Sequence, residues 1–311
     1  MAHSETCLRR WGARLIFPVT IAGALGLTWL ALDAGMEPAL ALGAVSMMVW
    51  LVVGLGERWL PYRTDWNRSR GDVRTDILHV FFSSYATIEL AKLMGIALLL
   101  PVAEWAGTRF GSPLWPTHWP LLLQLPLAAL TIEFGTYWMH RASHELPLLW
   151  RLHAVHHSPD RLYWLNAGRD HPLGAALTAL SSLPLAILLG IPADCLALYY
   201  ALQSANGLFQ HANIAMKLGP LNWVFSTADL HRWHHSVKIG EANHNYGQSL
   251  IAWDALFGTR YLPGTRGPER IGIDGMQDFP RGYTGQLGAP FRWARYAGAQ
   301  ETAAIARAHS R

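Results

Sequence analysis

Four apolar segments in the first half of this chain constrain its fold more than any other feature. They cover residues 15–34, 38–60, 77–103 and 119–139. Each is close to the length of about 20 residues that an α-helix needs to cross the hydrocarbon core of a bilayer. Only 15% of the 311 residues are charged, whereas about 25% is usual in soluble domains. Because a lipid-exposed backbone must satisfy its own hydrogen bonds, we expect an all-α, polytopic membrane helical bundle.

Basic residues alternate between the loops that join these segments. Arginines precede the first segment, accompany the connection from the second to the third, and follow the fourth, whereas the other two loops hold none or only Arg109. The positive-inside rule therefore predicts a cytoplasmic N-terminus and a cytoplasmic location for the residues after Met139. The first segment is longer than the core of a usual signal peptide, which favours a retained anchor. We expect the protein to lie in the inner (plasma) membrane of a bacterium. The sequence has no Lys/Arg-rich run, so we expect no nucleic-acid partner.

A fifth apolar region, residues 173–209, is interrupted by a turn sequence at 190–194 that contains glycine and proline. It predicts a helical hairpin that enters the membrane and returns. The fold expected is thus four spanning helices plus this hairpin. Whether or not its arms cross completely, His211 comes back to the side that holds His140.

Histidines cluster after the fourth segment, where 11 of the 15 lie between His140 and His244. Three motifs stand out: His140-Arg-Ala-Ser-His144, His153-Ala-Val-His156-His157 and His231-Arg-Trp-His234-His235. Because residues three and four apart share one helix face, each motif directs two or three imidazoles the same way. Eight ligands exceed the four of a zinc site and predict two metal ions. Imidazole suits Zn, Cu, Fe and Ni, and the motifs do not choose among them.

A chance cluster or a basic membrane-surface patch is the competing interpretation. Packed imidazoles are mostly uncharged at neutral pH, so they make a poor surface for lipid headgroups. Cys7 and Cys195 form no metal-binding pattern. Isolated histidines outside the cluster are expected to be surface or hydrogen-bonded residues.

In this order and spacing, the three motifs resemble those of the fatty acid hydroxylase/sterol desaturase superfamily over about residues 120–262. Further matching pieces are His171 with Pro172 and residues 209–214, 230–236, 245–247 and 253–259. The resemblance implies a di-iron centre near the cytoplasmic membrane face that uses O2 to hydroxylate or desaturate a lipid. Sterol, fatty acyl and alkylglycerol substrates all stay open. Electrons would come from NAD(P)H through a separate ferredoxin or cytochrome-type protein.

The resemblance also implies which side chains bind the two irons. The expected ligands are His140, His144, His153, His156, His157, His211, His231, His234 and His235. Possible additional ligands, or partners that orient the ligand rings, are His171, Glu145, Asp229, Asn213, Asn245 and Asp254. Asp170 is a further candidate partner, whereas His244 has no expected counterpart in the family. Glu133 lies inside the fourth segment, where a carboxyl group is costly, so we expect it to contact a ligand histidine or line the substrate path.

Three regions follow from these observations: an N-terminal transmembrane region (1–118), a catalytic region (119–262) and a polar C-terminal tail (263–311). Two other functions compete with the oxygenase. A membrane zinc hydrolase acting on a lipid amide would need fewer ligands and an open coordination position. A metal transporter would place ionisable residues deep within its spans, where this chain has few.

Overall fold

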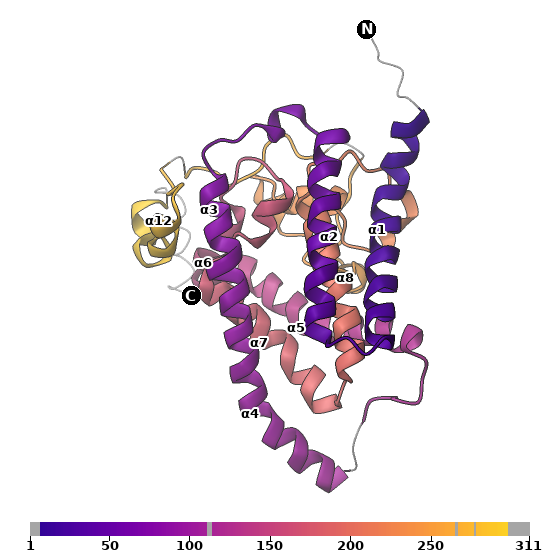
Figure 1. Cartoon of the computed structure of the whole chain (residues 1–311). Helices are drawn as coiled ribbons and strands as arrows, with labels where there is room; N and C mark the ends of the chain where they lie inside the picture. Colours follow the sequence, from indigo (N-terminus) through magenta and orange to yellow (C-terminus); the bar gives the residue numbers. More distant parts are fainter. Residues whose placement is uncertain (1–6, 111–113, 265–266, 277, 298–311) are drawn as a thin grey trace.

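The computed structural model describes residues 7–110, 114–264, 267–276 and 278–297, and these residues form helices and loops without a β-strand. Six helices of 18 residues or more make up a bundle (Figure 1). They are α1 (Cys7–Asp33), α2 (Pro38–Trp59), α4 (Ala86–Phe110), α5 (Leu121–Glu145), α7 (Pro172–Leu189) and α8 (Ala193–His211). Helix α7 packs against α4 and α5, and α8 packs against α1, α2 and α5. The expected all-α membrane fold is confirmed.

Four stretches of the described chain are long and apolar enough to cross a membrane. They are Cys7–Asp33, Pro38–Trp59, Val73–Arg109 and Pro172–Leu189. The first three coincide with expected spans, whereas the fourth is α7, the first arm of the expected hairpin. Helix α5 occupies the remaining expected span but is not among the four. Its polar residues Gln124 and Glu133 are both buried and hydrogen-bonded inside the bundle.

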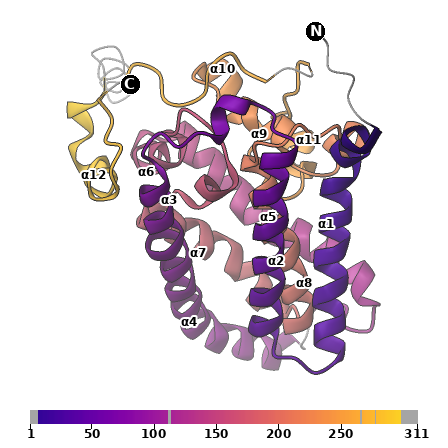
Figure 2. The same cartoon turned by 45° about the horizontal axis from the view of Figure 1, so that its top comes forward.

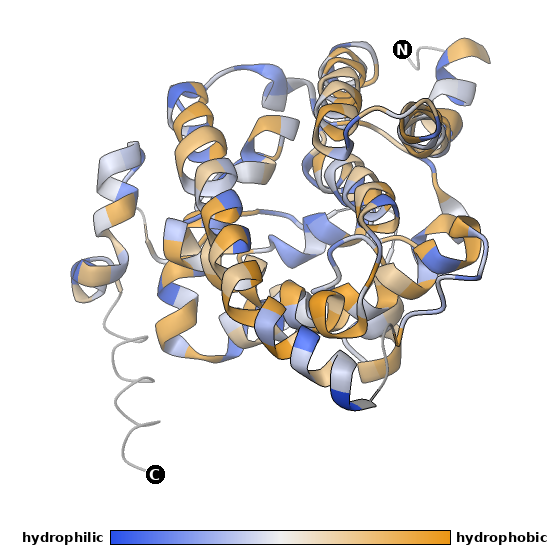
Figure 3. Ribbon diagram, turned by 60° about the horizontal axis from the view of Figure 1, so that its bottom comes forward, coloured by the Kyte–Doolittle hydropathy of each residue, from blue (hydrophilic) through white to orange (hydrophobic). Residues whose placement is uncertain are grey.

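The long helices consist largely of apolar residues, as the hydropathy colours of Figure 3 show, and many of these side chains are exposed. Leu51 of α2 and Leu93 and Leu98 of α4 each expose more than 60% of their surface. A continuous apolar surface of this kind is unusual in a soluble monomer and fits contact with lipid. The inward faces follow helical periodicity, since Val45, Val49 and Val53 of α2 are buried at intervals of four residues.

Close packing between α5 and α7 depends on one glycine. A Cβ atom at Gly135 would lie 2.0 Å from the carbonyl oxygen of Ser181 on α7. Only a residue without a side chain allows the two backbones to approach this closely. The contact fixes α5, which carries two of the histidines at its end, against the hairpin.

The hairpin forms as expected, with its turn at Gly190, which ends α7 in the left-handed conformation (φ 73°). Helix α8 then returns to the end of the bundle where α1 begins and where α6 (Pro147–His157) and α9 (Ala228–His234) lie (Figure 2). Pro147 starts α6 directly after α5 ends. Shorter helices complete this end: α3 (Val73–Leu78), α10 (Ile239–Ala242), α11 (Ala252–Phe257), the 3-10 turns η1 (Thr64–Asn67), η3 (Trp164–Gly168) and η4 (Gly219–Trp223), and the π-helix η2 (His79–Tyr85).

The described part of the expected polar tail is folded onto this same end. Helix α12 (Tyr283–Gly288) and the turn η5 (Pro290–Arg295) follow it. Phe279 and Trp293 bury their rings against Ala154 and Val155 of α6. The segment therefore covers the outer side of a helix that carries three of the histidines.

Candidate metal centre

Four elements bring the histidine motifs to one end of the bundle. His140 and His144 lie in the last turns of α5, and the motif 153–157 forms the C-terminal half of α6. The motif 231–235 lies on α9 and its C-cap, and His211 is the last residue of α8. As expected from the spacing, each motif lies on a helix, and its imidazole rings point toward those of the other motifs.

The nine imidazoles divide into two groups, and within each group one nitrogen per ring lies within 4.8 Å of the others. Group one comprises His140, His144, His153, His157 and His234. Group two comprises His156, His211, His231 and His235. Neighbours in sequence belong to different groups, since His156 and His235 face group two while His157 and His234 face group one.

Distances within the groups suit metal coordination. The Nε2 atoms of His140 and His153 are 3.1 Å apart, and those of His157 and His234 are 3.2 Å apart. In group two, the Nε2 atom of His231 lies 3.0 Å from that of His211 and 3.0 Å from that of His235. Two nitrogens bound at right angles to one ion at about 2.1 Å would lie about 3 Å apart.

Five of the nine rings make a hydrogen bond through Nδ1, which orients each ring. Nδ1 of His140 lies 2.8 Å from the carbonyl oxygen of Tyr246, and Nδ1 of His234 lies 2.8 Å from that of His244. The other three acceptors are the carbonyl of Arg169 for His156, Asn166 Oδ1 for His211 and Asn243 Oδ1 for His144. An acceptor at Nδ1 places the proton there and leaves the Nε2 lone pair free for a metal.

Burial keeps these rings uncharged. It lowers the pKa of His156 to about 4. Burial, followed by the neighbouring imidazoles, lowers the pKa values of His157 and His235 well below their ordinary range. Nε2 of His144 is buried without a hydrogen-bond partner. Neutral, buried imidazoles with unused nitrogens match the donor set of a transition-metal site better than that of Mg²⁺ or Ca²⁺.

Two of the expected partner residues, Asp254 and Asn245, form hydrogen bonds with backbone groups near the histidines. The carboxylate of Asp254 accepts hydrogen bonds from the backbone N–H groups of Tyr246 and Gly247, at 2.8 and 2.7 Å. Asn245 donates to the carbonyl of Leu230, next to His231. Both side chains hold the segment whose Tyr246 carbonyl accepts the hydrogen bond from His140.

Other expected partners lie away from both groups. The carboxylate of Glu145 is half exposed and pairs with Arg141, and Asp229 pairs with Arg232. Asn213 accepts from the backbone of Arg63. His171 accepts from the backbone N–H of Leu173 and caps the start of α7. The hydrogen bonds and ion pairs of these four side chains thus go to other parts of the chain, near in sequence for Glu145, Asp229 and His171 and 150 residues away for Asn213.

Glu133 and Asp170 have different roles. Glu133 accepts from the backbone N–H groups of Ser249 and Leu250, so it anchors a loop rather than contacting a ligand histidine or the cavity wall. A carboxylate oxygen of Asp170 lies 3.8 Å from Nδ1 of His156, beyond hydrogen-bond distance. His244 contributes its carbonyl to His234, while its own ring packs against Tyr261.

Sequence reasoning missed the two amide acceptors, Asn166 and Asn243. Asn166 lies nine residues after His157, whereas Asn243 directly precedes His244. Asn166 is completely buried in η3, and its Oδ1 also accepts from the backbone of Tyr163. The position of Asn243 beside His244 was the one available signal, and nothing in the sequence marked Asn166.

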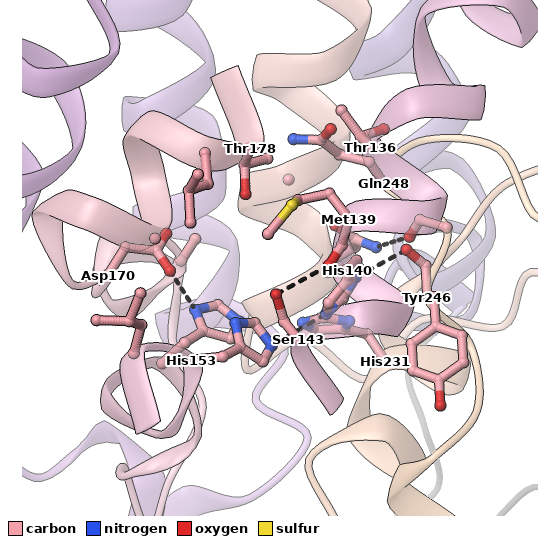
Figure 4. Close-up of a pocket in the computed structure, with 18 of the residues that line it drawn as sticks. Thr136, Met139, His140, Ser143, His153, Asp170, Thr178, His231, Tyr246 and Gln248 are labelled. Atoms are coloured by element: carbon pink, nitrogen blue, oxygen red, sulfur yellow. Dashed lines mark hydrogen bonds and ion pairs between the residues drawn. The ribbon is translucent and has the colours of Figure 1, made fainter. Parts of the chain in front are cut away.

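A cavity of about 160 Å³ opens beside both histidine groups (Figure 4). Its walls come from α5, α6, α7, α8, α9, η3 and the segments around Asp170 and 246–248. Five of the nine clustered histidines line it: His140, His153, His156, His211 and His231. A molecule in this cavity would therefore contact both groups at once.

Comparison with known proteins gives matches across most of the chain. The sequence pattern of the fatty acid hydroxylase family matches residues 125–259, which include every histidine of both groups. An ornithine lipid hydroxylase from Rhizobium tropici is 35% identical over 280 residues, covering 89% of this chain and 83% of that protein.

More distant relatives match about half of the chain. An alkylglycerol monooxygenase from Homo sapiens is 30% identical over 50% of this chain and 34% of its own length. A very-long-chain aldehyde decarbonylase from Oryza sativa is 27% identical over 53% of this chain and 62% of its own length. No solved structure matches the chain.

Proposed function

Because this chain belongs to the fatty acid hydroxylase family, we propose that it is a membrane-embedded enzyme that uses O2 to hydroxylate a lipid. One observation carries the proposal: nine imidazoles from four helices form two groups at the end of a bundle with lipid-facing sides, next to a shared cavity. A hydrolytic zinc site needs fewer ligands. A hydroxylase also needs room for its substrate beside its metal centre, and the cavity lined by five of these histidines supports this function.

We propose that each group holds one iron ion. Five imidazoles would hold the first and four the second. Iron bound there would supply the redox chemistry that activates O2 for attack on an unactivated C–H bond. The choice of iron over other transition metals rests on the resemblance to oxygenases, and the all-imidazole donor set supports it without selecting it.

The protein's own side chains would orient the centre and shield it. The acceptors at Nδ1 of His140, His144, His156, His211 and His234 would keep each Nε2 directed inward. Loss of such an acceptor typically weakens metal binding by about 10–100-fold. Phe279 and Trp293 pack on Ala154 and Val155 of α6. They would shield this side of α6, and with it the centre, from water.

The substrate class follows from the relatives. The ornithine lipid hydroxylase spans most of this chain, so an ornithine-type lipid is the first substrate to test, and an alkylglycerol is the second. Hydroxylation is favoured over desaturation because both relatives are named for the addition of oxygen.

The membrane arrangement is part of the same proposal. The N-terminal end of α1 and the helices that carry the histidine groups lie at one end of the bundle (Figure 2), and there the backbone N–H of Lys217 donates to the carbonyl of Ala13. The arginine-rich loops support a cytoplasmic location for that end, in the inner membrane of a bacterium. We propose that electrons from NAD(P)H reach it through a separate ferredoxin or cytochrome-type protein. The family match at 125–259 supports a catalytic region at 119–262 that follows the transmembrane region 1–118, with 263–311 as a further segment.

Purified protein tests the proposal through its metal content and its lipid products. Detergent-solubilised wild-type protein should contain about two irons per chain, one for each group. It should add oxygen to an ornithine-type lipid when supplied with O2, NAD(P)H and a reductase system. His156→Ala and His234→Ala should insert in the membrane normally yet form no product. More than about half of the wild-type activity in either variant would rule out the ligand assignment. One zinc per chain with lipid amide cleavage under nitrogen would replace the oxygenase with the zinc hydrolase.

A further inference from the structure

Each histidine group has its own segment of chain that orients its rings. The segment 243–246 carries the three acceptors that face Nδ1 atoms of group one. The segment 166–169 carries two acceptors that face Nδ1 atoms of group two. These are the carbonyl oxygen of Arg169, 3.2 Å from His156, and Oδ1 of Asn166, 2.9 Å from His211. A change confined to one segment would therefore disturb the rings of one group and spare the other.

The segment 166–169 is held by a carboxylate from the N-terminal part of the chain. Asp76 lies on α3, at the same end of the bundle as α6 and α9 (Figure 2), and is fully buried. One of its oxygens lies 2.5 Å from both Nε and Nη2 of Arg169. The other accepts a hydrogen bond from the hydroxyl group of Tyr163 at 2.5 Å. Asp76 thus binds residues on both sides of Asn166.

The π-helix η2, which continues α3, contacts the same segment. Oγ of Ser84 donates to the carbonyl oxygen of Gly168 at 2.8 Å. Nδ1 of the buried His79 lies 2.9 Å from the carbonyl oxygen of Asp170. A Cβ atom at Gly168 would lie 2.8 Å from Cγ2 of Val80, so the two backbones are closely packed. These contacts make α3 and η2 the support on which the segment rests.

Asp254 has the corresponding place for group one. It is also fully buried, and it accepts hydrogen bonds from the backbone N–H groups of residues 246–247 at 2.8 and 2.7 Å. Asp254 lies inside the part of the chain that matches the family pattern, 125–259, whereas Asp76 lies outside it, in the spanning stretch Val73–Arg109. Each orienting segment is therefore held by one buried carboxylate, and the two carboxylates come from different regions of the chain.

Loss of the Asp76 carboxylate should displace an acceptor for a physical reason. The guanidinium group of Arg169 is buried, and a buried charge that loses its partner is strongly unfavourable. The side chain would move to regain contact with water or another acceptor. Because the carbonyl oxygen that faces His156 belongs to Arg169 itself, such a movement would take the acceptor away from the ring.

We propose, building on the two-metal centre of the proposed function, that Asp76 is a positioning residue for group two. It acts through Arg169 and Tyr163. These two residues fix the acceptors that orient the rings of His156 and His211. The transmembrane region before residue 118 thereby completes the metal centre in addition to anchoring it. The effect is confined to group two, because the acceptors of group one belong to the other segment.

Titration of the metal-free, full-length protein with Co²⁺ tests this role without turnover. Co²⁺ binds imidazole sites, and its visible spectrum reports on the geometry of its ligands. Two backgrounds separate the groups, since His234→Ala leaves group two complete and His235→Ala leaves group one complete. Asp76→Asn should weaken Co²⁺ binding by about 10–100-fold and alter the spectrum in the first background. In the second background it should change the affinity by less than about twofold.

Asp254→Asn is the matched control, because it removes the carboxylate that holds the other segment. It should weaken binding in the His235→Ala background and spare the His234→Ala background. A general loss of stability would weaken both groups alike in either variant. Equal weakening of both groups by Asp76→Asn, or no weakening of group two, would overturn the proposal.

Tyr163→Phe keeps the proposal testable if Asp76→Asn does not fold. It removes one hydroxyl group and leaves the ion pair between Asp76 and Arg169 in place. It should weaken Co²⁺ binding to group two by a smaller factor than Asp76→Asn and leave group one unchanged. An unchanged group two in Tyr163→Phe would then overturn the proposal.

The titration and the lipid assay can fail independently. If Asp76→Asn weakens group two as expected but no lipid gains oxygen, the hydroxylase function fails and the positioning role is retained. If a lipid gains oxygen but Asp76→Asn leaves group two unchanged, the positioning role fails and the hydroxylase function is retained. Wild-type protein that binds no Co²⁺ in group two would overturn the positioning role.

Discussion

The Nε2 atoms of His157 and His234 lie 3.2 Å apart, although 77 residues separate them in the sequence. The contact joins α6 to α9 and completes group one. The adjacent pair His156 and His235 does the same for group two, with ring centroids 4.8 Å apart. The motifs 153–157 and 231–235 thus each contribute to both groups, because the two adjacent histidines at the end of each motif point in different directions.

This arrangement predicts that neighbouring histidines serve different ions. His234→Ala should remove one ligand of group one, and His235→Ala one ligand of group two. Each variant should retain about one of the two irons and lose activity by more than about a hundredfold, since ligands matter more than the groups that orient them. Elemental analysis and product assays of the two purified variants check this. Two irons and normal turnover in either variant would contradict the assignment.

A partner that the sequence did not reveal should matter for metal affinity. Asn243 Oδ1 lies 3.2 Å from Nδ1 of His144. Asn243→Ala should weaken iron binding by about 10–100-fold, whereas Asn243→Asp keeps an acceptor and should weaken it less. Iron retention during titration with a chelator measures both variants. Equal retention by wild-type protein and Asn243→Ala would show that the contact does not orient the ring.

Packing between α5 and α7 should be sensitive to a single methyl group. In Gly135→Ala the new Cβ would meet the carbonyl oxygen of Ser181, so we expect a loss of about 1–3 kcal/mol in the free energy of unfolding. Gly43→Ala in α2 is a matched control, because no atom lies within 4 Å of the added Cβ. Thermal unfolding in detergent compares the two. The expected order fails if Gly135→Ala melts at or above the wild-type temperature.

Acid should destabilise the metal-free protein. Burial lowers the pKa of His156 to about 4 and those of His157 and His235 well below their ordinary value of 6.5. The unfolded chain therefore binds more protons than the folded chain between about pH 6.5 and pH 4, and stability falls as the pH falls through that window. Unfolding midpoints at about pH 7.5 and pH 5 should show a clear drop at the lower pH. A midpoint that stays constant or rises on acidification would mean that these rings are not buried and neutral.

Hydropathy and residue spacing predicted the bundle, the hairpin and the clustering of the three histidine motifs, whereas His211 was added through the resemblance to the family. Helical periodicity places His140 and His144 on one face, and the turn at Gly190 returns His211 to them. Hydropathy was less informative about α5, because it contains the polar residues Gln124 and Glu133. Both are buried, and they accept hydrogen bonds from the ring of Trp115 and the backbone of Leu250. An apolar average cannot anticipate a polar side chain that is buried with its hydrogen bonds satisfied.

The groups that orient the ligands could not be predicted in the same way. Three of the five acceptors at Nδ1 are backbone carbonyls, which carry no residue-type signal. Glu133 was expected beside a ligand or the substrate path because acids are costly in a membrane, yet it binds the backbone at 249–250. Glu145, although it follows His144 directly, forms an ion pair with Arg141 on the same helix.

The most direct test of the central claim is the origin of the oxygen in the product. Iron-loaded wild-type protein, an electron-transfer system and an ornithine-type lipid are incubated under isotopically labelled O2, and the lipid is analysed by mass spectrometry. We predict a product that carries one labelled oxygen atom and is absent under nitrogen and in His234→Ala. Oxygen derived from water, or a product that forms equally well without O2, would contradict a lipid hydroxylase.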